Sequence, residues 1–126
     1  MESMKHYQDY FDKHLKSYNQ SKTPKNLYKP IQYVLEIGGK RLRPILTLIT
    51  ADCFGGNISD SLNAALAIEV FHNFTLIHDD IMDNAPLRRG KQTVHEKWNI
   101  NTGILSGDAM LIMAYKLFES YPQPQS

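Results

Sequence analysis

Residues 60–83 read DSLNAALAIEVFHNFTLIHDDIMD, and this stretch decides the fold class. Wound as a helix, it carries apolar side chains around most of its circumference; these are Leu62, Ala65, Leu66, Ile68, Phe71, Leu76 and Ile77. A helix that is apolar nearly all round is expected at the centre of a domain. Ser59 and Asp60 are the candidate N-caps, and the helix is expected to run to about Asp83.

Four further helices are expected on either side of this central stretch, because apolar residues recur there at three- and four-residue steps. They cover residues 3–19, 25–37, 44–54 and 103–119. Pro44 suits a first helical position, the Gly38-Gly39 pair suits a C-terminal stop, and Asn101 or Thr102 suits a cap for the last helix. Residues 84–92 read as a basic loop, and no segment alternates for long enough to indicate a sheet. The pattern predicts an all-α fold.

Length and composition restrict the function classes. The 126 residues suit one helical domain over 1–126, with an irregular, proline-containing tail at 121–126. A net charge of +1 gives no bulk attraction for nucleic acid, so any polyanion must be held by a local group of residues. A single cysteine, no signal-peptide pattern and no apolar run long enough to span a bilayer predict a cytoplasmic protein without a membrane span.

The end of the central helix carries an acidic cluster. Asp79 and Asp83 lie one turn apart on the same face, whereas Asp80 points about 100° away. Two like charges at this spacing destabilise a helix unless a cation compensates them, and Mg²⁺ is usually held by one or two carboxylates together with substrate phosphates. Arg88 and Arg89 follow closely and add cations for a polyanion. The alternative is a solvated acidic helix end.

A second basic cluster, GGKRLRP at residues 38–44, falls at a junction between two expected helices. The paired glycines permit close backbone approach to a ligand, and the cations suit an anion; a solvated turn is the alternative. His72 lies two helical turns before Asp79 on roughly the same face, which favours a hydrogen bond to substrate over a core position.

Three segments together resemble the trans-polyprenyl diphosphate synthases: GGKRLRP at 38–44, EVFHNFTLIHDDIMD at 69–83 and LRRGKQTVH at 87–95. The order and spacing of the segments also match that family, and the resemblance extends from Tyr28 to about Phe118. It implies an antiparallel helix bundle around an apolar cavity, a homodimer, and Mg²⁺-assisted condensation of an allylic diphosphate with isopentenyl diphosphate.

The resemblance also implies roles for individual residues. Asp79 and Asp83 would hold Mg²⁺, with Asp80 in support, and Arg88 would contact the allylic diphosphate. The diphosphate of isopentenyl diphosphate would be held by Lys40, Arg43, His72 and Arg89, with Arg41 assisting, and Phe74 and Thr75 would limit product length to the farnesyl or geranylgeranyl range.

The family has a second aspartate-rich motif in its C-terminal half, for which this sequence has no counterpart. We therefore expect the 126 residues to correspond to an N-terminal half. Two alternatives stay open. One is a non-catalytic helical fragment or subunit that keeps part of the diphosphate site; the other is a metal-dependent phosphohydrolase built on His78 and Asp79, which needs further histidines from neighbouring helices.

Overall fold

A computed structural model describes residues 2–20, 22, 24–37 and 39–119, so the predicted tail at 121–126 lies outside the described residues. Its elements are α1 (Glu2–Tyr18), α2 (Lys25–Ile37), α3 (Leu42–Cys53), α4 (Ile58–Met82), β1 (Leu87–Arg88), β2 (Lys91–Gln92), α5 (Val94–Lys97) and α6 (Ile100–Glu119). Apart from one short hairpin, every element is helical, which confirms the predicted all-α fold.

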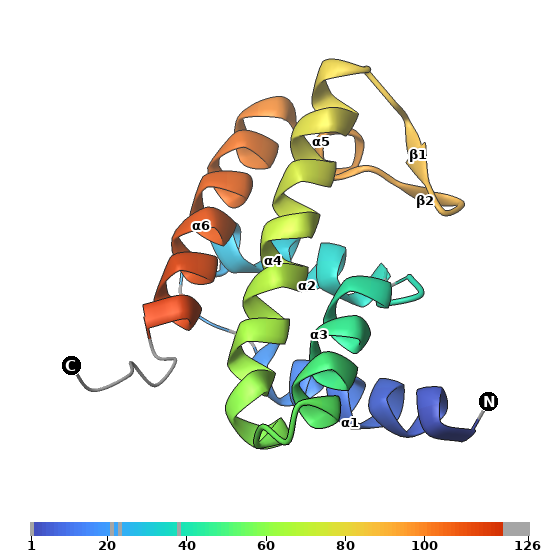
Figure 1. The fold of residues 1–126 in the computed structure, drawn as a ribbon. Helices are drawn as coiled ribbons and strands as arrows, with labels where there is room; N and C mark the ends of the chain where they lie inside the picture. The colour runs from blue at the N-terminus through green and yellow to red at the C-terminus, as the bar shows by residue number, and fades with distance from the viewer. Residues whose placement is uncertain (1, 21, 23, 38, 120–126) are drawn as a thin grey trace.

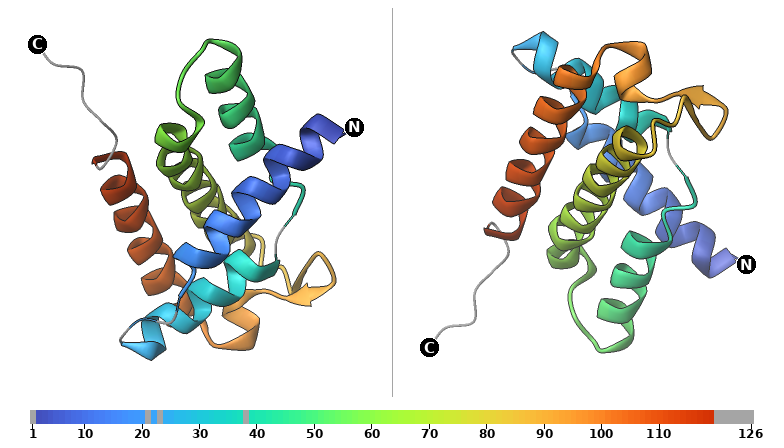
Figure 2. Two further views of the ribbon diagram at one scale, coloured as in Figure 1. Left: turned by 90° about the horizontal axis from the view of Figure 1, so that it is seen from below. Right: turned by 90° about the horizontal axis from the view of Figure 1, so that it is seen from above.

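Helix α4 forms the centre of the bundle, as its sequence predicted. Helices α3 and α6 run antiparallel to it on either side (Figure 1), and α1 crosses the bundle at an angle (Figure 2). Ala65, Leu66, Ala67 and Val70 of α4 are fully shielded from solvent. Burial of this apolar surface is the main favourable contribution to folding, at about 25 cal/mol for each Å² removed from water.

Small residues on α6 let that helix approach α4 closely. A side-chain carbon added at Gly103 would lie 3.0 Å from Cδ1 of Ile81, and one at Gly107 would lie 3.5 Å from Phe74. Both glycines are buried. Close-packed interiors tolerate added volume poorly, so these two positions set how near the two helices lie.

The helix boundaries differ from the sequence predictions by two or more residues at three N-termini. α6 is capped by Asn99, whose Oδ1 accepts a hydrogen bond from the backbone N–H of Thr102 at 2.8 Å, rather than by Asn101 or Thr102. α4 begins at Ile58, before the predicted caps, and α3 begins at Leu42, so that Pro44 is its third residue. Pro44 is still accommodated, because the first N–H groups of a helix have no partner within it.

The basic loop contains an antiparallel hairpin that the sequence did not predict. β1 pairs with β2 through Leu87 opposite Gln92 and Arg88 opposite Lys91. Arg89 and Gly90, the two turn residues, both have positive φ, 52° and 77°, as a two-residue type I′ turn requires. Strands of two residues carry no measurable alternation, so periodicity could not reveal them.

Several large apolar side chains of α6 are exposed; they are Ile100, Ile104, Leu105, Ile112, Tyr115 and Phe118. Within the described residues, the helices are too short or too polar for any of them to cross a membrane.

Candidate functional site

The acidic cluster lies at the C-terminal end of α4. Asp79 and Asp83 are exposed, and the backbone N–H of Asp83 donates to the carbonyl of Asp79 at 2.9 Å, so the helical turn between them is intact. Their carboxylates are hard oxygen ligands of the kind that Mg²⁺ takes. Among the described residues, no group of three or more His, Cys, Asp or Glu side chains could hold a metal ion. Two exposed carboxylates of this kind fit a cation that takes its remaining ligands from phosphate oxygens and water.

Asp80 faces away from these two carboxylates, as the helical spacing predicted, and binds Arg88. Nε and Nη2 of Arg88 donate to the two carboxylate oxygens at 2.9 and 2.8 Å, and the Asp80 side chain is only 11% exposed. The hydrogen bond to Asp80 raises the pKa of Arg88 above its usual value. This bidentate ion pair holds the start of the hairpin against α4.

A basic pocket of about 330 Å³ opens where the loop at residues 39–41, α3 and α4 meet the turn of the hairpin. It is lined by the four residues that the sequence assigned to one diphosphate, Lys40, Arg43, His72 and Arg89, and also by Gly39, Arg41, Leu42, Glu69, Asn73 and Leu76. The four come from three separate segments of the chain, and only the fold brings them together. The pocket is therefore suited to an anion with several charges.

His72 lies beside Arg43 in this pocket, with its Nε2 3.4 Å from Nη1 of Arg43. Partial burial, and then the charge of Arg43, lower the pKa of His72 below its usual value. The neutral imidazole therefore predominates at pH 7; one of its ring nitrogens donates a hydrogen bond and the other accepts one, and the tautomer decides which.

Arg41, predicted to assist at the same site, lines the basic pocket, and its guanidinium is held by Leu35 and Glu69. Nη2 donates to the carbonyl of Leu35 at 2.6 Å, and Nη1 lies 3.4 Å from Oε2 of Glu69. The side chain is 9% exposed. The sequence could not reveal this orientation, because it depends on a left-handed backbone at Arg41, with φ 56° and ψ 34°.

Phe74 and Thr75, the predicted length-limiting residues, occupy different surroundings. Phe74 packs against His78 and Phe71, with ring centroids 4.7 and 5.7 Å apart, on the side of α4 that meets α6. Thr75 lines an apolar pocket of about 300 Å³, together with Arg43, Ile68, Phe71, His72 and Phe118. This pocket shares Arg43 and His72 with the basic pocket, so polar and apolar binding surfaces are adjacent.

Glu69 and Asn73, two polar residues of α4, also line the basic pocket, although the sequence assigned them no role. Asn73 is buried, and its Nδ2 donates to Oε1 of Glu69 at 3.2 Å and to the Glu69 carbonyl at 2.8 Å. A polar Glu-x-x-x-Asn pair inside an otherwise apolar helix is the signal that could have identified them.

Comparisons with known proteins identify the family of this chain. The family model described as polyprenyl synthetase matches residues 24–126. The chain is 45% identical over 101 residues to geranylgeranyl pyrophosphate synthase of Geoglobus acetivorans, which covers 80% of this chain and 32% of that protein. It is 48% identical over 92 residues to farnesyl diphosphate synthase of Micrococcus luteus, covering 71% of this chain and 32% of that one.

Solved structures match over nearly the whole chain. A crystal structure of a geranylgeranyl pyrophosphate synthase superposes with a TM-score of 0.92 at 59% identity, covering 95% of this chain and 37% of the other. The geranylgeranyl pyrophosphate synthetase from Geoglobus acetivorans superposes with a TM-score of 0.91 at 38% identity, covering 96% and 40%. The chain thus spans about a third of the length of the curated relatives that it matches.

Proposed function

This chain belongs to the polyprenyl synthetase family, and on that premise we propose that it contributes the diphosphate-binding part of a prenyltransferase that condenses an allylic diphosphate with isopentenyl diphosphate. The observation that carries the proposal is the convergence of Lys40, Arg43, His72 and Arg89 on one pocket beside the helix that carries Asp79 and Asp83. Two separate charged groups, one basic and one acidic, suit two diphosphate substrates held side by side.

The basic pocket is proposed to hold isopentenyl diphosphate. Lys40, Arg43 and Arg89 supply fixed positive charge, and neutral His72 supplies a directional hydrogen bond. Holding the diphosphate at one place positions the rest of the molecule, and orientation of two reactants is a large part of a bimolecular rate enhancement.

The allylic diphosphate is proposed to lie at the end of α4, between Asp79, Asp83 and Arg88. Magnesium held by the two aspartates would supply Lewis-acid stabilisation of the departing diphosphate. Asp80 accepts from Nε and Nη2 of Arg88 and fixes that side chain, so the remaining N–H donors of the guanidinium would bind the departing diphosphate. Apolar side chains around Thr75 would exclude water from the allylic cation.

A second function, diphosphate binding without turnover, is supported by the basic pocket alone, because its cations suit an anion without requiring Mg²⁺. The phosphohydrolase alternative finds no support among the described residues, since His78 packs on Phe74, its buried Nε2 has no hydrogen-bond partner, and no metal-binding group of three side chains is present.

A turnover assay with isopentenyl diphosphate, geranyl diphosphate and Mg²⁺ tests the proposal. Products of farnesyl or geranylgeranyl length would support prenyl transfer and the length-limiting role of Phe74 and Thr75. Absence of product together with Mg²⁺-dependent binding of an allylic diphosphate analogue would support the binding function. Absence of both would overturn the proposed site.

We also propose that the chain forms homodimers. The exposed apolar side chains of α6 support association, because contiguous exposed apolar surface is uncommon on monomers. Sedimentation equilibrium would show a mass of twice 14.5 kDa if this is so, and a single 14.5 kDa species at micromolar concentration would contradict it. A cytoplasmic location stays a prediction.

A further inference from the structure

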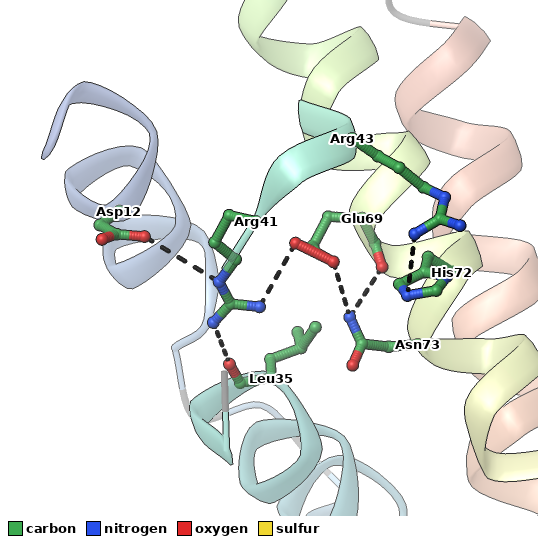
Figure 3. Close-up of polar contacts among 7 residues, drawn as sticks. All are labelled: Asp12, Leu35, Arg41, Arg43, Glu69, His72 and Asn73. Atoms are coloured by element: carbon green, nitrogen blue, oxygen red, sulfur yellow. Dashed lines mark hydrogen bonds and ion pairs between the residues drawn. The ribbon is translucent and has the colours of Figure 1, made fainter. Parts of the chain in front are cut away.

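Arg41 occupies an unusual place in the connection between α2 and α3. It is the N-cap of α3, it has left-handed backbone angles, and its side chain makes no capping hydrogen bond. Left-handed angles are unfavourable for a residue with a side chain, so they persist only where surrounding contacts impose them. The consequence is that Arg43 is directed toward His72, whereas Arg41 is directed toward α1 and α2 (Figure 3).

Contacts with three helices hold the Arg41 guanidinium. Toward α2, it donates to the carbonyl of Leu35, one of the last carbonyls of that helix, which have no partner within it. Toward α4, it forms an ion pair with Glu69 at 3.4 Å. Toward α1, Nε lies 4.0 Å from Oδ1 of Asp12, whose side chain is half exposed. One side chain thus ties the loop at residues 39–41 to three helices.

Glu69 is the buried member of this network. Its side chain is 5% exposed, and Oε1 accepts a hydrogen bond from Nδ2 of Asn73. Oε2 accepts no hydrogen bond from the described residues, so its negative charge is balanced only by the ion pair with Arg41. A buried carboxylate is retained only when a cation or hydrogen bonds compensate it. Glu69 also lines the basic pocket, where its negative charge by itself opposes the binding of an anion.

We propose that the Arg41–Glu69 pair is a positioning device that fixes the loop so that Lys40 and Arg43 face the diphosphate, without either member of the pair contacting the anion. The inference rests on the proposed function of the basic pocket. It explains why an acidic residue lies in the wall of an anion site. Glu69 holds Arg41, and Arg41 in turn holds the loop that carries Lys40 and leads to Arg43.

Glu69→Gln distinguishes positioning from direct electrostatics, because the two predict opposite signs. Removing a negative charge from the wall would strengthen anion binding if charge alone mattered. Loss of positioning instead weakens the affinity of the 126-residue chain for inorganic diphosphate by about threefold or more, measured by titration calorimetry. Asp12→Asn is the matched control, since it removes one negative charge near Arg41 at an exposed contact, and its affinity should stay within about twofold of the unchanged chain.

A double-mutant cycle adds a readout that general loosening would not produce. If Glu69 acts through Arg43, Arg43→Gln costs less affinity in the Glu69→Gln background than alone. Equal or tighter binding by Glu69→Gln would overturn the positioning role, as would additive losses. Failure of the unchanged chain to bind diphosphate would instead overturn the anion site itself and this inference with it.

Arg41→Lys keeps the inference testable should Glu69→Gln fail to fold. Lysine keeps the positive charge beside Glu69 but lacks the planar guanidinium group whose two terminal nitrogens contact Leu35 and Glu69 at once. Diphosphate affinity is expected to fall at least about threefold in a variant that still unfolds cooperatively. Affinity within about twofold of the unchanged chain would overturn the proposal.

Discussion

The guanidinium group of Arg89 lies against the backbone of Gly39, so that a side-chain carbon at Gly39 would be 3.0 Å from Nη2 and 3.2 Å from Cζ of Arg89. The two residues are fifty positions apart and meet because the hairpin turn leans toward the loop between α2 and α3. The absence of a side chain at Gly39 is therefore what admits Arg89 to the basic pocket.

Gly39→Ala is expected to weaken inorganic diphosphate binding by about tenfold, because the methyl group displaces the Arg89 guanidinium and a charge-assisted hydrogen bond is lost. Titration calorimetry measures the effect. Gly55→Ala is the matched control: Gly55 also has positive φ, but nothing lies within 4 Å of its added carbon. Gly55→Ala should lower the free energy of unfolding but leave the diphosphate affinity unchanged. Equal losses of affinity in the two variants would contradict the role of Gly39.

The sequence predicted the directions of the site's side chains on α4, where helical spacing alone determines them, better than in the loops. Asp79 and Asp83 share a face, and Asp80 points away, because all three lie on or next to one continuous helix. The direction of Arg41 was not predictable, since it depends on a single left-handed residue in a loop. Contacts between segments distant in the sequence, such as that of Gly39 with Arg89, have no local signature at all.

Asp80→Asn tests whether the pair with Arg88 anchors the hairpin. Asparagine cannot form the two charge-assisted bonds, so the free energy of unfolding in urea should fall by about 1.5–3 kcal/mol. The exposed Asp83 provides the comparison, because Asp83→Asn should change stability by less than about 0.5 kcal/mol. A similar small change in both variants would mean that the pair contributes no net stability.

The lowered pKa of His72 predicts that diphosphate binding depends on pH. Burial and Arg43 lower its pKa in the free protein, Arg88 and Arg89 act in the same direction, and Glu69 opposes them. A bound anion offsets these cations and raises the pKa again, so His72 takes up protons on binding below about pH 7. Calorimetry in two buffers of different ionisation enthalpy measures this uptake.

The ligand also titrates, and the comparison with His72→Gln isolates the contribution of the histidine. The unchanged chain should take up more protons on binding than the variant at pH 6, and the two should agree above pH 8, where the imidazole is neutral in both the free and the bound state. Identical proton uptake at pH 6 would show that His72 does not sense the anion.

The separation of the acidic cluster from the basic pocket predicts that the metal affects one diphosphate site more than the other. Asp79→Ala removes one of the two exposed carboxylates that suit Mg²⁺, so Mg²⁺-dependent binding of an allylic diphosphate analogue should be lost. Metal-free binding of inorganic diphosphate to the basic pocket should stay within about twofold of the unchanged chain, because Asp79 does not line that pocket.

Asp108→Ala, at an exposed carboxylate on α6, is the control for charge alone. If Asp79→Ala and Asp108→Ala bind the analogue equally well in the presence of Mg²⁺, the acidic cluster is not a metal site.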